Sequence, residues 1–117
     1  MADWKRPKEI PSNTTRIATE CGGLYITKGF EDEKLIEIRG VIGKGGTCPN
    51  CQLDNFCRVV SMYLQSPEPR YKIIKKFTKQ FEGSNCGQPF IWEEKKYLSC
   101  HDYIAQSVIK ELEKQVG

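Results

Sequence analysis

Histidine is almost absent from this sequence, which has His101 alone, and no stretch of it is apolar for long. Any Ser–His or Cys–His catalytic pair would have to use that one imidazole, so we do not expect the chain to be an enzyme by itself. The N-terminal residues 1–7 (MADWKRP) lack an apolar signal-peptide core, and no segment approaches the roughly 18 apolar residues of a membrane span. These absences predict a cytoplasmic protein without a membrane partner.

A strong charge bias is also missing. The 18 Lys and Arg residues against 15 Asp and Glu give a net charge of only +3, without a dense basic block, so nucleic acid is not an expected partner. One predicted helix does carry several basic residues, which we interpret as a solvated face: Arg70, Lys72, Lys75, Lys76 and Lys79. The 117 residues, 38% of them hydrophobic, fit one globular domain. We expect an extended lead-in over residues 1–13 and a single domain over residues 14–117.

The first half of that domain has the pattern of a sheet. Residues 14–19, 24–28 and 35–41 are rich in β-branched and apolar residues, and polar and apolar residues alternate over residues 36–39 (IEIR). The polar residues 29–34 between the last two segments have a length that suits a hairpin. The sequence therefore predicts a small antiparallel sheet of about three strands.

Helical spacing replaces this alternation from Leu53 onward. Three segments show it, with apolar residues at Leu53, Phe56, Cys57, Val60 and Leu64, then at Ile73, Ile74, Phe77 and Phe81, and finally at Ile104, Val108 and Leu112. Ser99 followed by Asp102 resembles a capping box at the start of the last helix. We expect an α+β fold in which about three helices follow the sheet, while residues 83–98 form a loop or a loop with a short strand.

The six cysteines carry the main functional signal, because a reducing compartment favours metal ligands or redox thiols over disulfides. Four of them lie at the ends of predicted elements, where loops can converge: Cys21, Cys48, Cys86 and Cys100. A helix N-terminus also lowers a thiol's pKa and favours the thiolate that metals need. Sets of thiolates select zinc or iron–sulfur centres. The plainer alternative is that several of the six are small buried hydrophobes, which we expect for Cys57.

The strongest local motif is the C-x-x-C of residues 48–51 (CPNC), although no second C-x-x-C accompanies it. Two sulfurs at this spacing can reach one metal ion. The same spacing also suits a dithiol redox pair, with Cys48 as the attacking thiol and Cys51 as its resolving partner. His101 is a candidate ligand or second-shell group, but a solvated histidine at a helix N-terminus is the simpler interpretation.

A glycine-rich segment precedes this motif. Residues 42–47 (IGKGGT) resemble a phosphate-cradling turn, in which Lys44, Gly45 and Gly46 would face an anion. The segment lacks the full Walker spacing, so a tight turn that brings Cys48 close to a metal is the favoured interpretation. A nucleotide or phosphate ligand stays as the alternative.

Taken in order, four segments of the chain follow the pattern of the TSCPD domain family: residues 21–27 (CGGLYIT), 43–48 (GKGGTC), 82–86 (EGSNC) and 98–105 (LSCHDYIA). The resemblance covers roughly residues 6–114, and the family is best known at the C-terminal end of vitamin-B12-dependent class II ribonucleotide reductases. In the Thr-Ser-Cys-Pro-Asp motif that names the domain, this chain has Leu98 for the threonine and His101 for the proline, while Ser99, Cys100 and Asp102 match.

The resemblance favours a set of four cysteine ligands over the two cysteines of the C-x-x-C motif. Cys21, Cys48, Cys86 and Cys100 fall where the family pattern has cysteine, and Cys51 is an addition of this chain. The layout is also similar to U-type iron–sulfur scaffold proteins, which implies zinc or, as the alternative, an iron–sulfur cluster, with Asp102 as a candidate second-shell group. The implied role is a metal-binding accessory domain linked to ribonucleotide reduction, with a ribonucleotide reductase or another protein as partner.

Overall fold

A computed structural model of the chain describes residues 5–19, 22–43, 48–81, 83 and 89–116, with the side chains of residues 48, 49 and 116 outside the description. Within this part of the chain, none of the helices combines the length and the apolar character that crossing a membrane requires.

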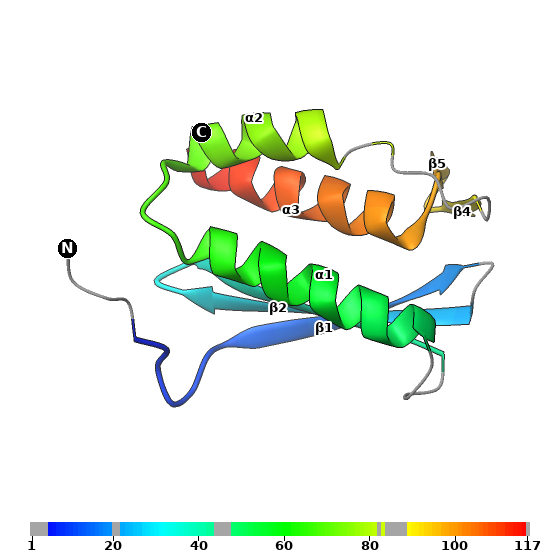
Figure 1. The fold of residues 1–117 in the computed structure, drawn as a ribbon, viewed down its shortest axis with the longest axis horizontal. Helices are drawn as coiled ribbons and strands as arrows, with labels where there is room; N and C mark the ends of the chain where they lie inside the picture. Colours follow the sequence, from blue (N-terminus) through cyan, green and yellow to red (C-terminus); the bar gives the residue numbers. More distant parts are fainter. Residues whose placement is uncertain (1–4, 20–21, 44–47, 82, 84–88, 117) are drawn as a thin grey trace.

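Three antiparallel strands form the main sheet, in the order β1-β2-β3 (Figure 1). They span β1 (Ser12–Thr19), β2 (Gly22–Glu31) and β3 (Lys34–Ile42). Ile17 of β1 lies opposite Leu24 of β2, which in turn lies opposite Ile42 of β3. The β2–β3 turn places Asp32 and Glu33 at positive φ, 51° and 66°, as a two-residue hairpin turn of type I′ requires. The predicted hairpin and three-stranded sheet are thus confirmed.

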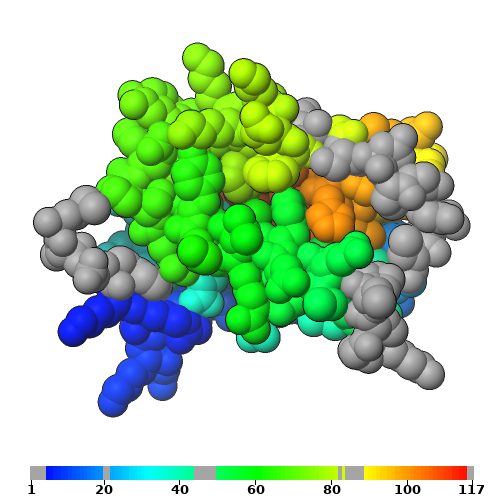
Figure 2. All heavy atoms as spheres, viewed as in Figure 1, coloured from blue at the N-terminus to red at the C-terminus, as the bar shows by residue number. Residues whose placement is uncertain are grey.

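Three helices follow: α1 (Cys48–Leu64), α2 (Arg70–Gln80) and α3 (Cys100–Val116). All three lie on one side of the sheet (Figure 1). Contacts with the sheet come from α1 and α3, whereas α2 packs against α3. Figure 2 shows α1 and α2 on the near face, with the start of α3 in orange between them. The predicted α+β arrangement is confirmed, and Ser99 Oγ accepts a hydrogen bond from the Asp102 N–H at 2.9 Å, as the capping motif indicated.

Residues between α2 and α3, which the sequence left open, include a second small hairpin. Strands β4 (Phe90–Trp92) and β5 (Lys95–Tyr97) pair antiparallel and form their own two-stranded sheet. Its turn residues Glu93 and Glu94 both have positive φ, 48° and 65°. Glutamate is uncommon in this conformation, which asparagine and glycine usually occupy, so no turn signal was present in the sequence.

The core lies between the sheet and the helices. It contains every apolar residue of the α1 and α3 stripes except the half-buried Phe56, together with Ile73 and Phe77 of α2. Gly40 lets α1 approach β3, because a Cβ there would stand 3.2 Å from Leu53 Cδ2 and 3.3 Å from Cys57 Sγ. Cys57 is 1% exposed, and burial raises its pKa to about 12, which makes it a core residue as predicted. The α2 lysines are exposed, as expected of a solvated face, whereas Arg70 is half-buried.

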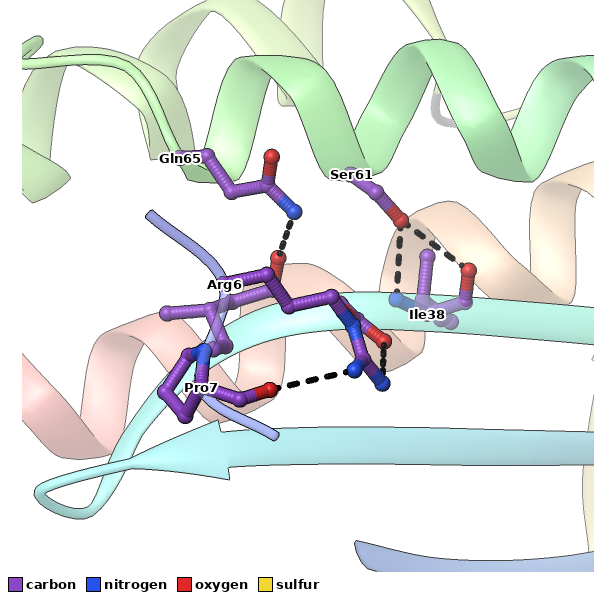
Figure 3. Close-up of polar contacts among 7 residues, drawn as sticks. Arg6, Pro7, Ile38, Ser61 and Gln65 are labelled. Atoms are coloured by element: carbon purple, nitrogen blue, oxygen red, sulfur yellow. Dashed lines mark hydrogen bonds and ion pairs between the residues drawn. The ribbon is translucent and has the colours of Figure 1, made fainter. Parts of the chain in front are cut away.

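Polar side chains of α1 and of Gln65, the residue that follows it, cover the open edge of β3. Ser61 Oγ accepts a hydrogen bond from the Ile38 N–H at 3.0 Å and donates to the Ile38 carbonyl at 3.1 Å (Figure 3). Gln65 Nε2 donates to the Ile36 carbonyl at 3.1 Å. Strand-edge groups satisfied in this way cannot pair with another strand, so α1 protects this side of the sheet from association. On the lead-in, the Arg6 guanidinium pairs with the Glu37 carboxylate.

Candidate functional site

Of the four predicted cysteine ligands, Cys100 is the one whose side chain the structure describes. Cys48 is the first residue of α1, but its side chain lies outside the description. Cys21 and Cys86 lie outside the described residues, as do Lys44, Gly45 and Gly46 of the glycine-rich turn. The residues that flank these segments are described, and their contacts define the surroundings of the candidate site.

Cys100 opens α3 and is 8% exposed. Its thiol approaches Thr19 Oγ1 at 4.0 Å, and that hydroxyl donates a hydrogen bond to the Gly22 carbonyl at 2.8 Å. Thr19 and Gly22 are the described residues on either side of residues 20 and 21. The N-terminus of α3 therefore lies against Thr19, two residues before Cys21, and the Thr19 hydroxyl in turn contacts Gly22, which follows Cys21.

The end of β3 is held against the same place. Gly43 donates a backbone hydrogen bond to the Gly23 carbonyl at 3.2 Å, and a Cβ built on Gly22 would lie 3.9 Å from the Gly43 Cα. Gly22 and Gly43 have φ values of +119° and +57°, which L side chains rarely adopt. These two glycines allow the start of β2 and the residue after β3 to lie side by side.

Asn50, in the first turn of α1, fixes the helix to the sheet, a role that the sequence did not predict. Its Oδ1 accepts a hydrogen bond from the Ile42 N–H at 2.8 Å, and the residue is 9% exposed. This bond attaches the start of α1, where Cys48 lies, to the end of β3. The sequence shows an asparagine inside the C-x-x-C motif. It does not show that the asparagine bonds to Ile42, because that contact depends on how α1 packs on the sheet.

Asp102 organises the N-terminus of α3. It is 2% exposed, and Oδ1 accepts hydrogen bonds from the Gly83 N–H at 2.6 Å and Gln106 Nε2 at 2.9 Å. Its other oxygen, Oδ2, accepts from the Leu98 N–H at 2.9 Å. One carboxylate thus joins α3 both to the β5–α3 turn and to Gly83, three residues before Cys86. The sequence pattern indicated Asp102 only as a helix cap and a candidate second-shell group.

His101 lies beside Cys100, and its ring is not simply solvated, in contrast to the simpler interpretation of the sequence. The ring packs edge-on against Phe56 of α1, with the centroids 4.7 Å apart. Burial lowers the pKa of the imidazole below its ordinary value of 6.5. The ring is therefore a packing contact between α1 and α3, and its second-shell role stays a prediction.

Cys51 is exposed on the first turns of α1, where Asn55 Nδ2 lies 3.8 Å from its sulfur. Among the side chains that the structure describes, no three His, Cys, Asp or Glu residues lie close enough together to hold a metal ion. Three of the four predicted ligands fall outside that set, and so does the Cys48 thiol of the predicted dithiol pair. The metal site and the redox pair both stay predictions.

Comparison with known proteins identifies the family. The model of the TSCPD domain matches residues 2–112, which is nearly the whole chain. We found no match among curated proteins or among solved structures. The chain belongs to the TSCPD domain family.

Proposed function

We propose that this member of the TSCPD domain family binds one zinc ion through the thiolates of Cys21, Cys48, Cys86 and Cys100. The observation that supports the proposal most is the contact of the Cys100 thiol with Thr19, because it brings the one described candidate ligand to the chain next to Cys21. Soft thiolates are the donors that zinc prefers, and a complete set of four leaves no open position for catalysis. The site would then be structural.

The flanks of the other two cysteines support the same placement. Asp102 holds Gly83 at the N-terminus of α3, and Gly83 is three residues from Cys86. Asn50 holds the first turn of α1 at the end of β3, and the Gly43–Gly23 hydrogen bond joins that end to the start of β2. Consecutive Cα atoms are about 3.8 Å apart, so each cysteine is tethered to a described residue by at most a few such steps. Four thiolates that meet here would have to come from four separate segments, and the metal would join them.

Metal analysis of the purified protein and a matched series of variants test the proposal. We expect one zinc per chain, retained by Cys51→Ser and lost by Cys100→Ser and Cys86→Ser. Cobalt substitution should give the intense visible absorption of a tetrahedral thiolate site. Protein purified anaerobically with no tightly bound metal would refute the proposal. If the four cysteines held an iron–sulfur cluster, the proposal would be wrong about zinc. If Cys51→Ser lost the metal and Cys86→Ser retained it, the proposed ligand set would be wrong.

One observation favours the dithiol alternative. Cys48 and Cys51 lie one turn apart at the N-terminus of α1, and Cys51 is exposed to a partner. A helix N-terminus stabilises a thiolate, so Cys48 would attack a substrate disulfide and Cys51 would resolve the mixed disulfide. Alkylation rates of metal-free protein against pH test this, with Cys51→Ser leaving Cys48 as the reactive thiol. A Cys48 thiol that reacts no faster than an unfolded cysteine at neutral pH would exclude the redox role.

We further propose that the domain serves as an accessory of ribonucleotide reduction. The support is family membership, together with a described fold that is one small α+β unit. In this proposal the radical chemistry takes place in the reductase. Sedimentation of the zinc-loaded chain with a class II ribonucleotide reductase from the same organism tests the link, with the chelated Cys100→Ser variant as control. Absence of a complex, together with unchanged reductase activity, would exclude it.

A further inference from the structure

A groove of about 740 Å³ runs along α3, and its lining residues include none of the proposed metal ligands. Its walls come from α3, the β4–β5 hairpin, Lys28 of β2 and two residues of α2. The volume lies within the roughly 300–1,000 Å³ of pockets that hold small organic ligands. What distinguishes the groove is that its two ends differ in chemistry.

One end is aromatic. Trp92, Tyr97 and Tyr103 line it, and the rings of the two tyrosines meet edge to face with centroids 4.8 Å apart. Glu93 and Lys95 of the hairpin line this end as well, and Lys95 Nζ lies 5.4 Å from the Tyr97 ring centroid. Burial raises the pKa of both phenols above their ordinary value of 10, so they stay neutral at physiological pH. All three rings are half-buried, which leaves part of each surface open to a ligand. Such rings form a platform on which a planar heterocycle can stack.

The other end is basic. Lys28, Lys110 and Lys114 line it, and Lys28 and Lys114 share a single carboxylate, since their Nζ atoms lie 3.4 Å and 3.8 Å from Glu111 Oε1. Glu113 also lines this end and offsets part of the charge. Both ion pairs are long, and one carboxylate cannot neutralise two ammonium groups. Phosphate oxygens would give these lysines further charged acceptors.

The distance between the two ends suits a molecule that carries both chemistries. Tyr103 and Lys110 are seven residues apart on α3, which at 1.5 Å per residue is about 10 Å, and Lys114 is one further turn away. A nucleoside di- or triphosphate spans such a distance from its base to its terminal phosphates. We propose that this groove binds a nucleoside di- or triphosphate, with the base on Trp92 and Tyr103 and the phosphates among Lys28, Lys110 and Lys114.

Trp92 provides a direct reporter of binding, because it lines the groove and the chain has only one other tryptophan, Trp4. In a Trp4→Phe background, ATP and ADP should quench the fluorescence in a saturable manner, and adenosine should bind at least about tenfold more weakly because it lacks the charged contacts. Lys110→Gln/Lys114→Gln should weaken ATP binding by about tenfold or more, whereas Glu111→Gln should tighten it by removing a competing carboxylate.

Two further variants show whether ATP binds in this groove or at the glycine-rich turn. Tyr103→Leu keeps an apolar side chain in the wall and should weaken ATP about tenfold while binding of inorganic tripolyphosphate is unchanged, since stacking acts only on the base. Lys44→Ala, in the glycine-rich turn, should leave ATP binding unchanged. No saturable quenching by ATP would overturn the proposal. Equal affinity for tripolyphosphate and ATP would also overturn it. A loss of ATP binding in Lys44→Ala but not in Lys110→Gln/Lys114→Gln would do the same, provided that circular dichroism shows every variant folded.

Discussion

Replacement of Asp102 should destabilise the fold strongly for a small change in side-chain volume. Its buried carboxylate accepts hydrogen bonds from the N–H groups of Gly83 and Leu98 and from the Gln106 amide. In Asp102→Ala the Gln106 side chain and the N–H of the exposed Gly83 can turn to water, whereas the N–H of the half-buried Leu98 loses its charged partner with less access to water. The loss at Leu98 should cost about 2–3 kcal/mol and the loss at Gly83 about 1 kcal/mol, for a total of about 3–4 kcal/mol.

That total is large beside the roughly 5–15 kcal/mol of a typical domain, so the variant should be near the limit of folding. Asp102→Asn keeps one acceptor oxygen and should lose about half as much, about 2 kcal/mol. Urea unfolding followed by circular dichroism gives both values, at fixed zinc and again with a chelator. Asp54→Ala is the matched control, because Asp54 only pairs with Arg58 one turn away on α1 and should change stability by about 0.5 kcal/mol or less. If Asp102→Ala resembled this control, the carboxylate would not hold the segments together.

Three other predictions concern single contacts. With its pKa raised to about 12, Cys57 should resist alkylation in the folded protein across neutral pH, whereas the exposed Cys51 should react; fast labelling of both would contradict the core assignment. Ser61→Ala with Gln65→Ala should cost about 2 kcal/mol and, by freeing the β3 edge, produce self-association visible in sedimentation, while a strictly monomeric variant would argue against edge protection. His101 should titrate with a pKa below 6.5 by NMR. Because the unfolded chain binds the proton more readily than the folded one, this histidine contributes stability above about pH 6.5 that is lost as the pH falls. The corresponding change in the free energy of unfolding with pH should be absent in His101→Phe.

The fold could be predicted largely from periodicity, because apolar residues on alternate positions specify strands and those at helical spacing specify helices. Leu53, Val60 and Leu64 are buried as their spacing indicated. The β4–β5 hairpin could not be predicted, because its strands have three residues each and its turn is Glu93-Glu94. That turn is maintained by the packing of its flanking aromatic residues on α3, a tertiary effect with no local sequence signal.

The candidate site was predictable to a different extent. The capping pair Ser99 and Asp102 is local, so four residues of sequence were enough to find it. The bond from Asp102 to Gly83 joins residues 19 apart, and the bond from Asn50 to Ile42 joins a helix to a strand edge. Such partners depend on how elements pack, and a single sequence shows only which residue types are available. Cys21 and Cys86 could be selected as candidates from their positions at the ends of predicted elements, and the family resemblance then favoured the set of four over the C-x-x-C pair.

Both proposals involve the first turn of α3, which links them physically. Cys100 and Asp102 contact Thr19 and Gly83, and the adjacent Tyr103 turns its ring to Tyr97 in the groove wall. A helix is stiff over one turn, so a metal that fixes Cys100 would also fix the position of Tyr103. Asp102→Asn should then weaken zinc and nucleotide binding together, whereas Lys114→Gln should weaken the nucleotide alone. Sharing this turn would couple the two ligands, and by linkage each would strengthen the other by the same factor.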